Sequence, residues 1–121
     1  MAVAVVLGAF GAHGLQNLND ITPRQVSAWD TAVLYHLLHS LGLILVGMAL
    51  VLKPNLHLLR WVARFFVLGV LLFSGSLYAL VLGAPSWLGP VTPLGGTFLI
   101  AGWLLFSYAT WHGLSKAGGG D

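Results

Sequence analysis

The histidines of the second apolar stretch are the residues of this sequence best suited to chemistry. His36 and His39 lie three residues apart, and Ser40 follows one helical turn after His36. On an α-helix this spacing places the three side chains on roughly one face. Imidazole can carry a proton or ligate a metal ion, and ionisable groups inside a membrane commonly mark a ligand or ion pathway. This face is therefore the first candidate for a binding site.

Polar side chains from other segments should lie at the same side of a membrane. If the apolar stretches cross in alternating directions, their polar residues gather in one leaflet. The candidate ligand-binding site or polar network comprises His13, His36, His39, Ser40, Ser74, Ser76, Tyr78 and Thr92. Asp30 is the nearest acid, about one and a half turns before His36, and it could orient an imidazole.

Two interpretations of this polar set stay open. In the first, the side chains line a pocket in the non-cytoplasmic leaflet that binds a metal, a haem or a quinone. In the second, they hydrogen-bond across helices and hold the bundle in register. We favour the second, because one histidine pair spaced i, i+3 is a weak metal signal and the sequence has no HExxH motif. No cofactor is therefore predicted.

A lipid bilayer is the partner that the composition predicts. Apolar residues make up 58% of the 121-residue chain and charged residues only 7%, whereas a soluble domain carries about 25% charged residues. The five basic residues are scattered and form no clustered patch of the kind that binds nucleic acid. The chain has no cysteine, and its three acids are all aspartates. We expect an integral membrane protein with no nucleic-acid partner.

The hydropathy pattern predicts an all-α fold, an integral membrane bundle of four transmembrane helices forming a single domain over residues 1–121. The expected helices cover about 1–14, 23–52, 58–83 and 94–115. Thr22, Pro23 and Gln25 have the pattern of a capping box with proline at the first helical position, so the second helix should start in the interface. The first helix is short for a bilayer, so either the natural chain starts upstream of Met1 or a short helix packs on its neighbours.

Basic residues predict how the chain is oriented. Lys53, Arg60 and Arg64 lie in the second loop and near the entry of the third helix and Lys116 lies in the tail, whereas Arg24 stands at the first loop. Because basic residues accumulate on the cytoplasmic side, both termini should face the cytoplasm. Arg60 and Arg64 are expected to reach lipid phosphates. The glycine-rich tail that starts at Lys116 is expected to be mobile.

Small residues recur every four positions on two of the expected helices. Such spacing permits close approach of helices in a membrane, where packing of small residues replaces the hydrophobic effect as the main attraction. The predicted helix-packing residues are Ala4, Gly8 and Ala12 on the first helix and Gly75, Ala79 and Gly83 on the third. The contacts could lie within one bundle or between protomers, and spacing alone does not separate the two.

Five short strings together resemble the family called domain of unknown function 423, small bacterial membrane proteins related to transmembrane protein 256 of mitochondria. The strings are GAFGAHGL at 8–15, YHLLHSL at 35–41, FSGSLY at 73–78, VTPLGG at 91–96 and AGW at 101–103. The resemblance implies a four-helix protein of the bacterial inner membrane, and it implies no known reaction or cofactor. Members have several more residues before the first string, so the short first helix departs from the family pattern.

Three functions are weighed for this chain. The first is a non-enzymatic accessory or scaffold subunit whose glycine-containing faces contact either a second copy or a larger membrane complex. The alternative is a binder or transporter of a small ligand, metal or quinone-like molecule through the polar pocket. A membrane enzyme with a histidine as general base ranks last, because there is no obvious nucleophile and none of Asp20, Asp30 and Asp121 is expected deep in the bilayer.

Overall fold

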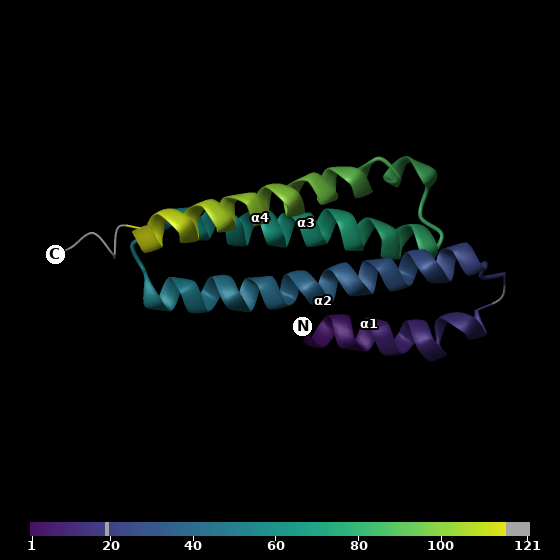
Figure 1. The fold of residues 1–121 in the computed structure, drawn as a ribbon. Helices are drawn as coiled ribbons and strands as arrows, with labels where there is room; N and C mark the ends of the chain where they lie inside the picture. Colours follow the sequence, from purple (N-terminus) through teal and green to yellow (C-terminus); the bar gives the residue numbers. More distant parts are fainter. Residues whose placement is uncertain (19, 116–121) are drawn as a thin grey trace.

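The computed structural model describes residues 1–18 and 20–115 (Figure 1). Within these residues the chain forms four α-helices and no strand. The helices are α1 (Ala2–His13), α2 (Pro23–Leu52), α3 (His57–Val81) and α4 (Val91–Ser115), with 3-10 turns at Leu15–Asn17 and Ser86–Leu88. Figure 1 shows α2, α3 and α4 side by side along their lengths, whereas α1 lies beside only that half of α2 which follows the first loop. The predicted tail after Lys116 lies outside the described residues.

The helix lengths fit a bilayer for three of the four helices. The helix α2 has 30 residues and α3 and α4 have 25 each. At about 1.5 Å per residue, 25 residues extend about 37 Å, more than the roughly 30 Å of the hydrocarbon core. All three are apolar enough to span a membrane, while α1 has only 12 residues. The predicted all-α membrane bundle with a short first helix is confirmed.

Local sequence explains where the helices begin and end. The capping box at the start of α2 is confirmed: the Thr22 side chain accepts from the Gln25 backbone N–H, and the Gln25 side chain accepts from the Thr22 N–H. The helix α4 begins at Val91, three residues before the expected start at 94. Pro93 falls in the first turn, where a missing N–H costs nothing, so the helix can start ahead of it.

The helix α3 ends in a glycine turn. Gly83 has a φ of 95°, in the left-handed region that favours glycine. The Ala84 N–H donates to the Ala79 carbonyl and the Gly83 N–H donates to the Leu80 carbonyl. This pair of bonds is the Schellman motif, which satisfies the last carbonyls of a helix. Gly83 therefore terminates α3 at the end of the bundle that also carries the α1–α2 loop (Figure 1).

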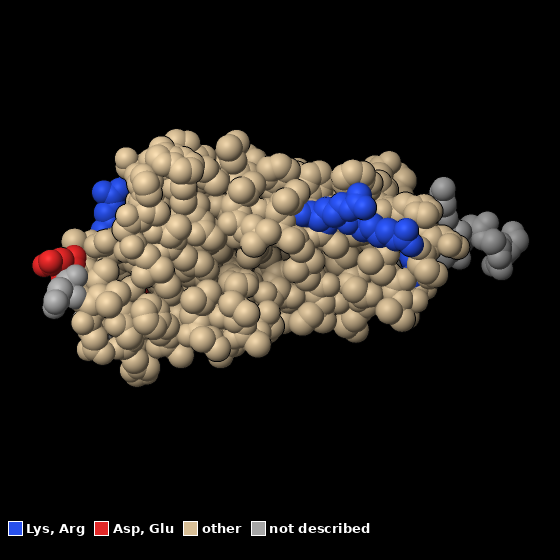
Figure 2. Space-filling view, turned by 180° about the vertical axis from the view of Figure 1, so that it is seen from behind, with Lys and Arg blue, Asp and Glu red and all other residues tan. Residues whose placement is uncertain are grey.

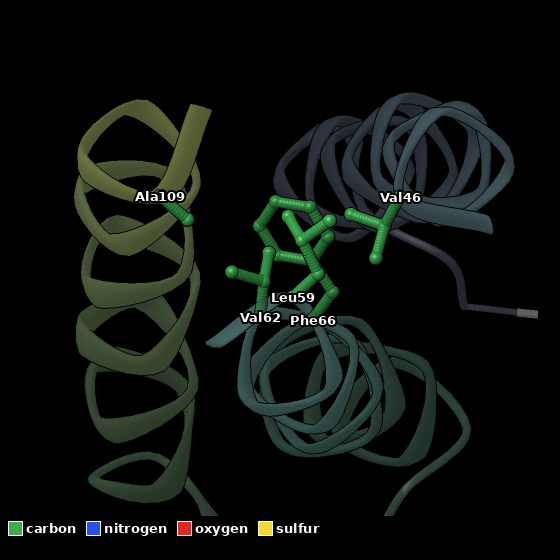
Figure 3. Packing of buried hydrophobic residues seen from close by; sticks show 5 residues of the cluster. All are labelled: Val46, Leu59, Val62, Phe66 and Ala109. Carbon is green, nitrogen blue, oxygen red and sulfur yellow. The ribbon is translucent and has the colours of Figure 1, made fainter. Parts of the chain in front are cut away.

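One hydrophobic core lies between α2, α3 and α4 toward the α2–α3 loop (Figure 3). Its buried residues are Val46, Leu59, Val62, Phe66 and Ala109. Glycines on two helices make room for the largest of these side chains. A Cβ on Gly102 would lie 2.7 Å from the Phe66 ring, and a Cβ on Gly42 would lie 2.9 Å from it. The ring thus fills space that any other residue at these positions would take.

A second core lies toward the α1–α2 loop and attaches α1. Its buried residues are Leu15, Trp29, Val33 and Val81. The Trp29 indole N–H donates to the Leu7 carbonyl of α1 at 2.9 Å. A Cβ on Gly11 would lie 2.6 Å from the Trp29 ring. The glycine therefore allows the indole to lie directly against the α1 backbone.

The predicted small-residue contacts lie in different surroundings. On α1, Ala4 is buried and a Cβ on Gly8 would lie 3.3 Å from Val33, whereas Ala12 is exposed. On the third-helix stripe Ala79 is half-buried, and among the described residues a Cβ built on Gly75 or Gly83 would meet no atom of another helix within 4 Å. The side of each glycine on which a side chain would stand is therefore open. A contact there between protomers stays a prediction.

Close approach of α3 and α4 depends instead on other glycines. A Cβ on Gly95 would collide with the Phe73 backbone N, and a Cβ on Gly69 would collide with the Leu99 side chain. Gly95 lies in the first half of α4 and Gly69 near the middle of α3. Both helices thus contribute a residue without a side chain, and their backbones can lie close together.

The described charged side chains lie toward the two ends of the bundle, and at one end they extend along the surface toward the middle (Figure 2). Figure 2 shows Lys and Arg at both ends, Asp at one of them, and a long uncharged surface between. Arg24 and Asp30 belong to the start of α2, whereas Lys53, Arg60 and Arg64 belong to its end and to the start of α3. The uncharged middle is the surface expected for contact with hydrocarbon.

Candidate functional site

His39 lies at the centre of the bundle with both ring nitrogens hydrogen-bonded. The side chain is only 4% exposed. Its Nδ1 lies 2.8 Å from the Tyr35 carbonyl, and the Trp103 indole N–H donates to its Nε2 at 3.0 Å. Because a carbonyl only accepts, Nδ1 must carry the proton and Nε2 must be the acceptor. A metal could reach Nε2 only if the Trp103 indole moved away.

Aromatic rings enclose the His39 imidazole. Its ring centroid is 5.4 Å from that of Phe66, edge-on, and 5.9 Å from those of Tyr35 and Trp103. The Trp103 and Phe66 rings are themselves 4.8 Å apart. Such rings bring much apolar contact, and a buried indole N–H needs an acceptor. His39 supplies that acceptor inside a tightly packed cluster from α2, α3 and α4.

Ser74 joins α3 to α2. The side chain is fully buried, and its hydroxyl donates to the Ala32 carbonyl at 2.8 Å. This carbonyl belongs to α2, so the bond crosses between the two helices. Ser74 therefore acts as an interhelical contact, and it presents no free hydroxyl to a ligand.

Ser76 and Thr92 join the end of α3 to the start of α4. Their hydroxyl oxygens are 2.7 Å apart, and the Ser76 hydroxyl also lies 3.0 Å from the Phe73 carbonyl. Since the carbonyl can only accept, Ser76 donates to it and Thr92 donates to Ser76. Ser76 is 4% exposed, so this bond too is inside the protein.

His36 and Tyr78 form the loosest contact of the set. The Tyr78 hydroxyl lies 3.5 Å from His36 Nδ1, at the limit of a hydrogen bond. The Tyr78 ring packs on Trp29, with centroids 4.7 Å apart. Both His36 and Tyr78 are half-buried. This pair could exchange its mutual bond for a ligand more easily than His39 could.

The remaining sequence-predicted residues do not join the others. His13 and Asp30 are exposed, and Ser40 is half-buried. The His13 carbonyl, rather than its ring, takes part in a hydrogen bond, from Asn17 at 2.8 Å. Within residues 1–18 and 20–115, no group of three or more His, Cys, Asp or Glu side chains is placed to hold a metal ion. Within the predicted set, the structure pairs Ser76 with Thr92 and His36 with Tyr78, whereas His39 and Ser74 bond to residues outside the set.

Three residues that sequence reasoning did not assign carry important contacts. Trp29 fastens α1, Trp103 bonds to His39, and the Lys53 ammonium donates to the Gly113 carbonyl at 2.6 Å. A signal for Trp103 is present in the sequence, because a tryptophan deep within an apolar stretch needs an acceptor for its N–H. No comparable signal identifies the partner of Lys53.

The polar residues are satisfied within the protein. Among the described residues no buried side-chain nitrogen or oxygen lacks a hydrogen-bond partner. Four of the bonds made by buried side chains join different helices: Trp29 to Leu7, Ser74 to Ala32, Trp103 to His39, and Ser76 to Thr92. Two longer bonds of half-buried side chains, Gln25 to Val81 and His36 to Tyr78, also cross between helices at 3.5 Å. Unsatisfied polar groups are costly in a bilayer, so bonds of this kind fix helix position and rotation.

Comparison with known proteins assigns the chain to a family. The family described as Protein of unknown function (DUF423) matches residues 7–96. A UPF0382 membrane protein of Staphylococcus haemolyticus is 41% identical over 109 residues, covering 89% of this chain and 85% of the relative. The UPF0382 membrane protein YwdK of Bacillus subtilis is 39% identical over 107 residues, covering 88% and 85%.

A relative also occurs in a yeast. A UPF0382 membrane protein of Schizosaccharomyces pombe is 38% identical over 107 residues, covering 84% of this chain and 86% of the relative. No solved structure matches this chain. With a family match over most of the chain and relatives that are named membrane proteins, the chain belongs to the DUF423 family, membrane proteins of unknown function.

Proposed function

We propose that this protein is a non-enzymatic accessory or scaffold subunit of the bacterial inner (plasma) membrane. The observation that carries the proposal is the state of His39: both ring nitrogens bond to groups of the protein itself, Tyr35 and Trp103. The histidine best placed for chemistry thus serves packing. Ser74, Ser76 and Thr92 of the candidate set are likewise used to join helices.

Location and orientation form part of the same proposal. Relatives from Staphylococcus and Bacillus support a bacterial plasma membrane. The end of the bundle that carries Lys53, Arg60 and Arg64 faces the cytoplasm, because basic residues are retained there. The end of α4 then lies on the cytoplasmic side, and the start of α1 points toward that side from beside the middle of α2 (Figure 1). Partners are a second copy of the chain or a larger membrane complex.

A ligand-binding function is the second candidate, and the contact between His36 and Tyr78 favours it. At 3.5 Å this bond is long, and both side chains are partly open to the surroundings. A metal, haem or quinone could bind the imidazole there without disturbing the His39 cluster. The scaffold proposal therefore depends on His39, whereas the ligand-binding function depends on His36.

The deciding experiment uses protein purified from its native membrane in mild detergent, with His36→Ala and His39→Ala beside the natural sequence. Elemental analysis, an optical spectrum and the particle mass are measured on each. The scaffold proposal expects no stoichiometric metal or chromophore, and a particle larger than one chain. It also expects that His39→Ala lowers thermal stability more than His36→Ala does.

Two results would count against the scaffold proposal. A chromophore or metal that is lost in His36→Ala but retained in His39→Ala would establish the ligand-binding function instead. A strictly monomeric particle without co-purifying protein would remove the basis for an accessory or scaffold role.

A further inference from the structure

A cavity of about 160 Å³ lies at the end of the bundle that carries the α2–α3 loop. Side chains from α2, from the loop, from α3 and from α4 line it, including Ala49, Leu56, Leu59 and Thr110. The wall is almost entirely apolar, because the Thr110 hydroxyl donates to the Phe106 carbonyl of its own helix. A cavity of about 150 Å³ with such a wall accommodates a benzene-sized apolar group. A short segment of hydrocarbon chain fits this space.

Lys53 provides a positive charge at the cavity. Its side chain is half-buried and contributes to the lining. The ammonium donates to the Gly113 carbonyl at 2.6 Å. An ammonium group has three N–H donors, so two remain for another acceptor.

The charge of Lys53 has no carboxylate to balance it among the described residues. Asp20 and Asp30, the described acids, lie at the other end of the 30-residue helix α2. The Lys53 end instead adds Arg60 and Arg64, both exposed (Figure 2). A ligand at this end should therefore be an anion.

The depth of the cavity matches a lipid. Lys53 follows directly after the last residue of α2, at the level expected for headgroups, and Ala49 lies one helical turn deeper. An occupant must therefore be negative at the membrane surface and hydrocarbon below it. This arrangement of charge over chain is that of a phospholipid and differs from that of a soluble anion or a peptide.

We propose that this cavity is a binding site for one anionic phospholipid, with its phosphate on Lys53 and part of an acyl chain against Ala49 and Leu59. The inference concerns the leaflet at the Lys53 end, whichever side of the membrane that is. It is therefore independent of the proposed orientation and of a scaffold role.

Native mass spectrometry of the protein in micelles tests the site. The micelles contain equal amounts of phosphatidylglycerol and phosphatidylcholine with the same acyl chains. The natural sequence should retain one phosphatidylglycerol per chain in preference to phosphatidylcholine. Lys53→Met should lower that retention about fivefold, the effect of one basic residue near an anionic surface. Ala49→Leu should fill the cavity and lower retention of both lipids.

Matched variants separate a site from general charge attraction. Arg24→Gln removes one positive charge at the opposite end and should leave retention unchanged. Lys53→Arg keeps charge and donors and should retain phosphatidylglycerol nearly as well as the natural sequence. If Lys53→Met does not fold, Ala49→Leu and Lys53→Arg still decide the question.

Several outcomes would overturn the lipid site. They are equal retention of the two lipids by the natural sequence, equal losses in Lys53→Met and Arg24→Gln, and undiminished retention in Ala49→Leu. Displacement of the lipid by millimolar inorganic phosphate would identify a site for soluble anions instead. A lipid-free dimer would show that a second copy occupies the surface.

Discussion

A buried histidine whose two ring nitrogens are both hydrogen-bonded within the protein has a different role from a histidine with a nitrogen free to bind a ligand. The imidazole of His39 donates to Tyr35 and accepts from Trp103, so its two sides connect a helix backbone with a neighbouring helix. In hydrocarbon, an indole N–H without an acceptor is costly. One hydrogen bond between α2 and α4 therefore satisfies both the Trp103 N–H and the His39 Nε2.

Replacing Trp103 tests this role at the level of single residues. Trp103→Phe keeps an aromatic ring but leaves Nε2 of the buried His39 without its donor. We expect a loss of about 1–2 kcal/mol in the free energy of unfolding. Unfolding by titration with a denaturing detergent in mixed micelles measures it. Trp87→Phe is the control, because Trp87 is 69% exposed and should change stability little.

The double variant completes this test. His39→Phe together with Trp103→Phe removes both partners, so its cost should be less than the sum of the two single costs. If the loss of stability in the double variant equals the sum of the two single losses, the two side chains do not interact.

The polar residues of the candidate site could be predicted from the sequence, but their hydrogen-bond partners could not. The sequence placed His36, His39, Ser74, Ser76 and Tyr78 in one leaflet. Which of these side chains meet depends on the rotation of each helix about its axis, and hydropathy does not determine that rotation. The structure accordingly pairs His39 with a tryptophan that the sequence left unassigned. It leaves His13 exposed at the end of α1.

At the scale of helices, glycines decide how closely neighbours approach. Gly95→Ala places a methyl group on the Phe73 backbone, which has no flexible end that could move aside. We expect a loss of about 1–3 kcal/mol in stability, the range for overpacking. The control Gly47→Ala lies on the exposed face of α2 with open space around its Cβ. It should gain up to about 1 kcal/mol from helix propensity.

Thermal unfolding in detergent compares the two glycine variants. Gly95→Ala should lower the free energy of unfolding and Gly47→Ala should raise it, although both variants add the same methyl group. If both variants change stability equally, the contact between α3 and α4 does not depend on Gly95.

The attachment of α1 gives a second test at this scale. Gly11→Ala places a methyl group 2.6 Å from the Trp29 ring position, so the indole must turn and release the Leu7 carbonyl. We expect faster amide hydrogen exchange along α1, with exchange in α3 and α4 unchanged. Ala12→Val, on the exposed side of the same helix, serves as the control and should leave exchange as it is.

Helices themselves were predictable because their signals are local. Long apolar stretches locate α2, α3 and α4, and the Thr22 capping box locates the start of α2. The start of α4 was less predictable, since Pro93 suits a first turn as well as a break ahead of the helix. The small-residue spacing on the third helix indicated packing at Gly83, but this glycine terminates the helix in a left-handed turn.

For the molecule as a whole, the distribution of charge should set its orientation. Changing Lys53, Arg60 and Arg64 together to Gln removes the basic residues that follow α2 and belong to the start of α3. The bias between the two sides then rests on Lys116 against Arg24, so we expect two orientations in place of one. A cysteine introduced at Ser86 reports the side by labelling with a membrane-impermeant maleimide. The chain contains no other cysteine to interfere.

Arg24→Gln provides the contrast to that triple variant. It removes the basic residue of the first loop, so a single orientation should persist with the Ser86 position outside. If labelling is the same in all three proteins, the basic residues do not determine the orientation.

The four interhelical bonds made by buried side chains also differ in how they constrain substitution during evolution. Trp29 and Ser74 donate to main-chain carbonyls, at Leu7 and Ala32, which every amino acid supplies. A replacement at either acceptor position is limited by size alone. Trp103 with His39, and Thr92 with Ser76, join two side chains, so a change in one partner leaves the other without its bond. We expect relatives and mutational scans to show these two pairs changing together, while positions 7 and 32 vary independently of their donors.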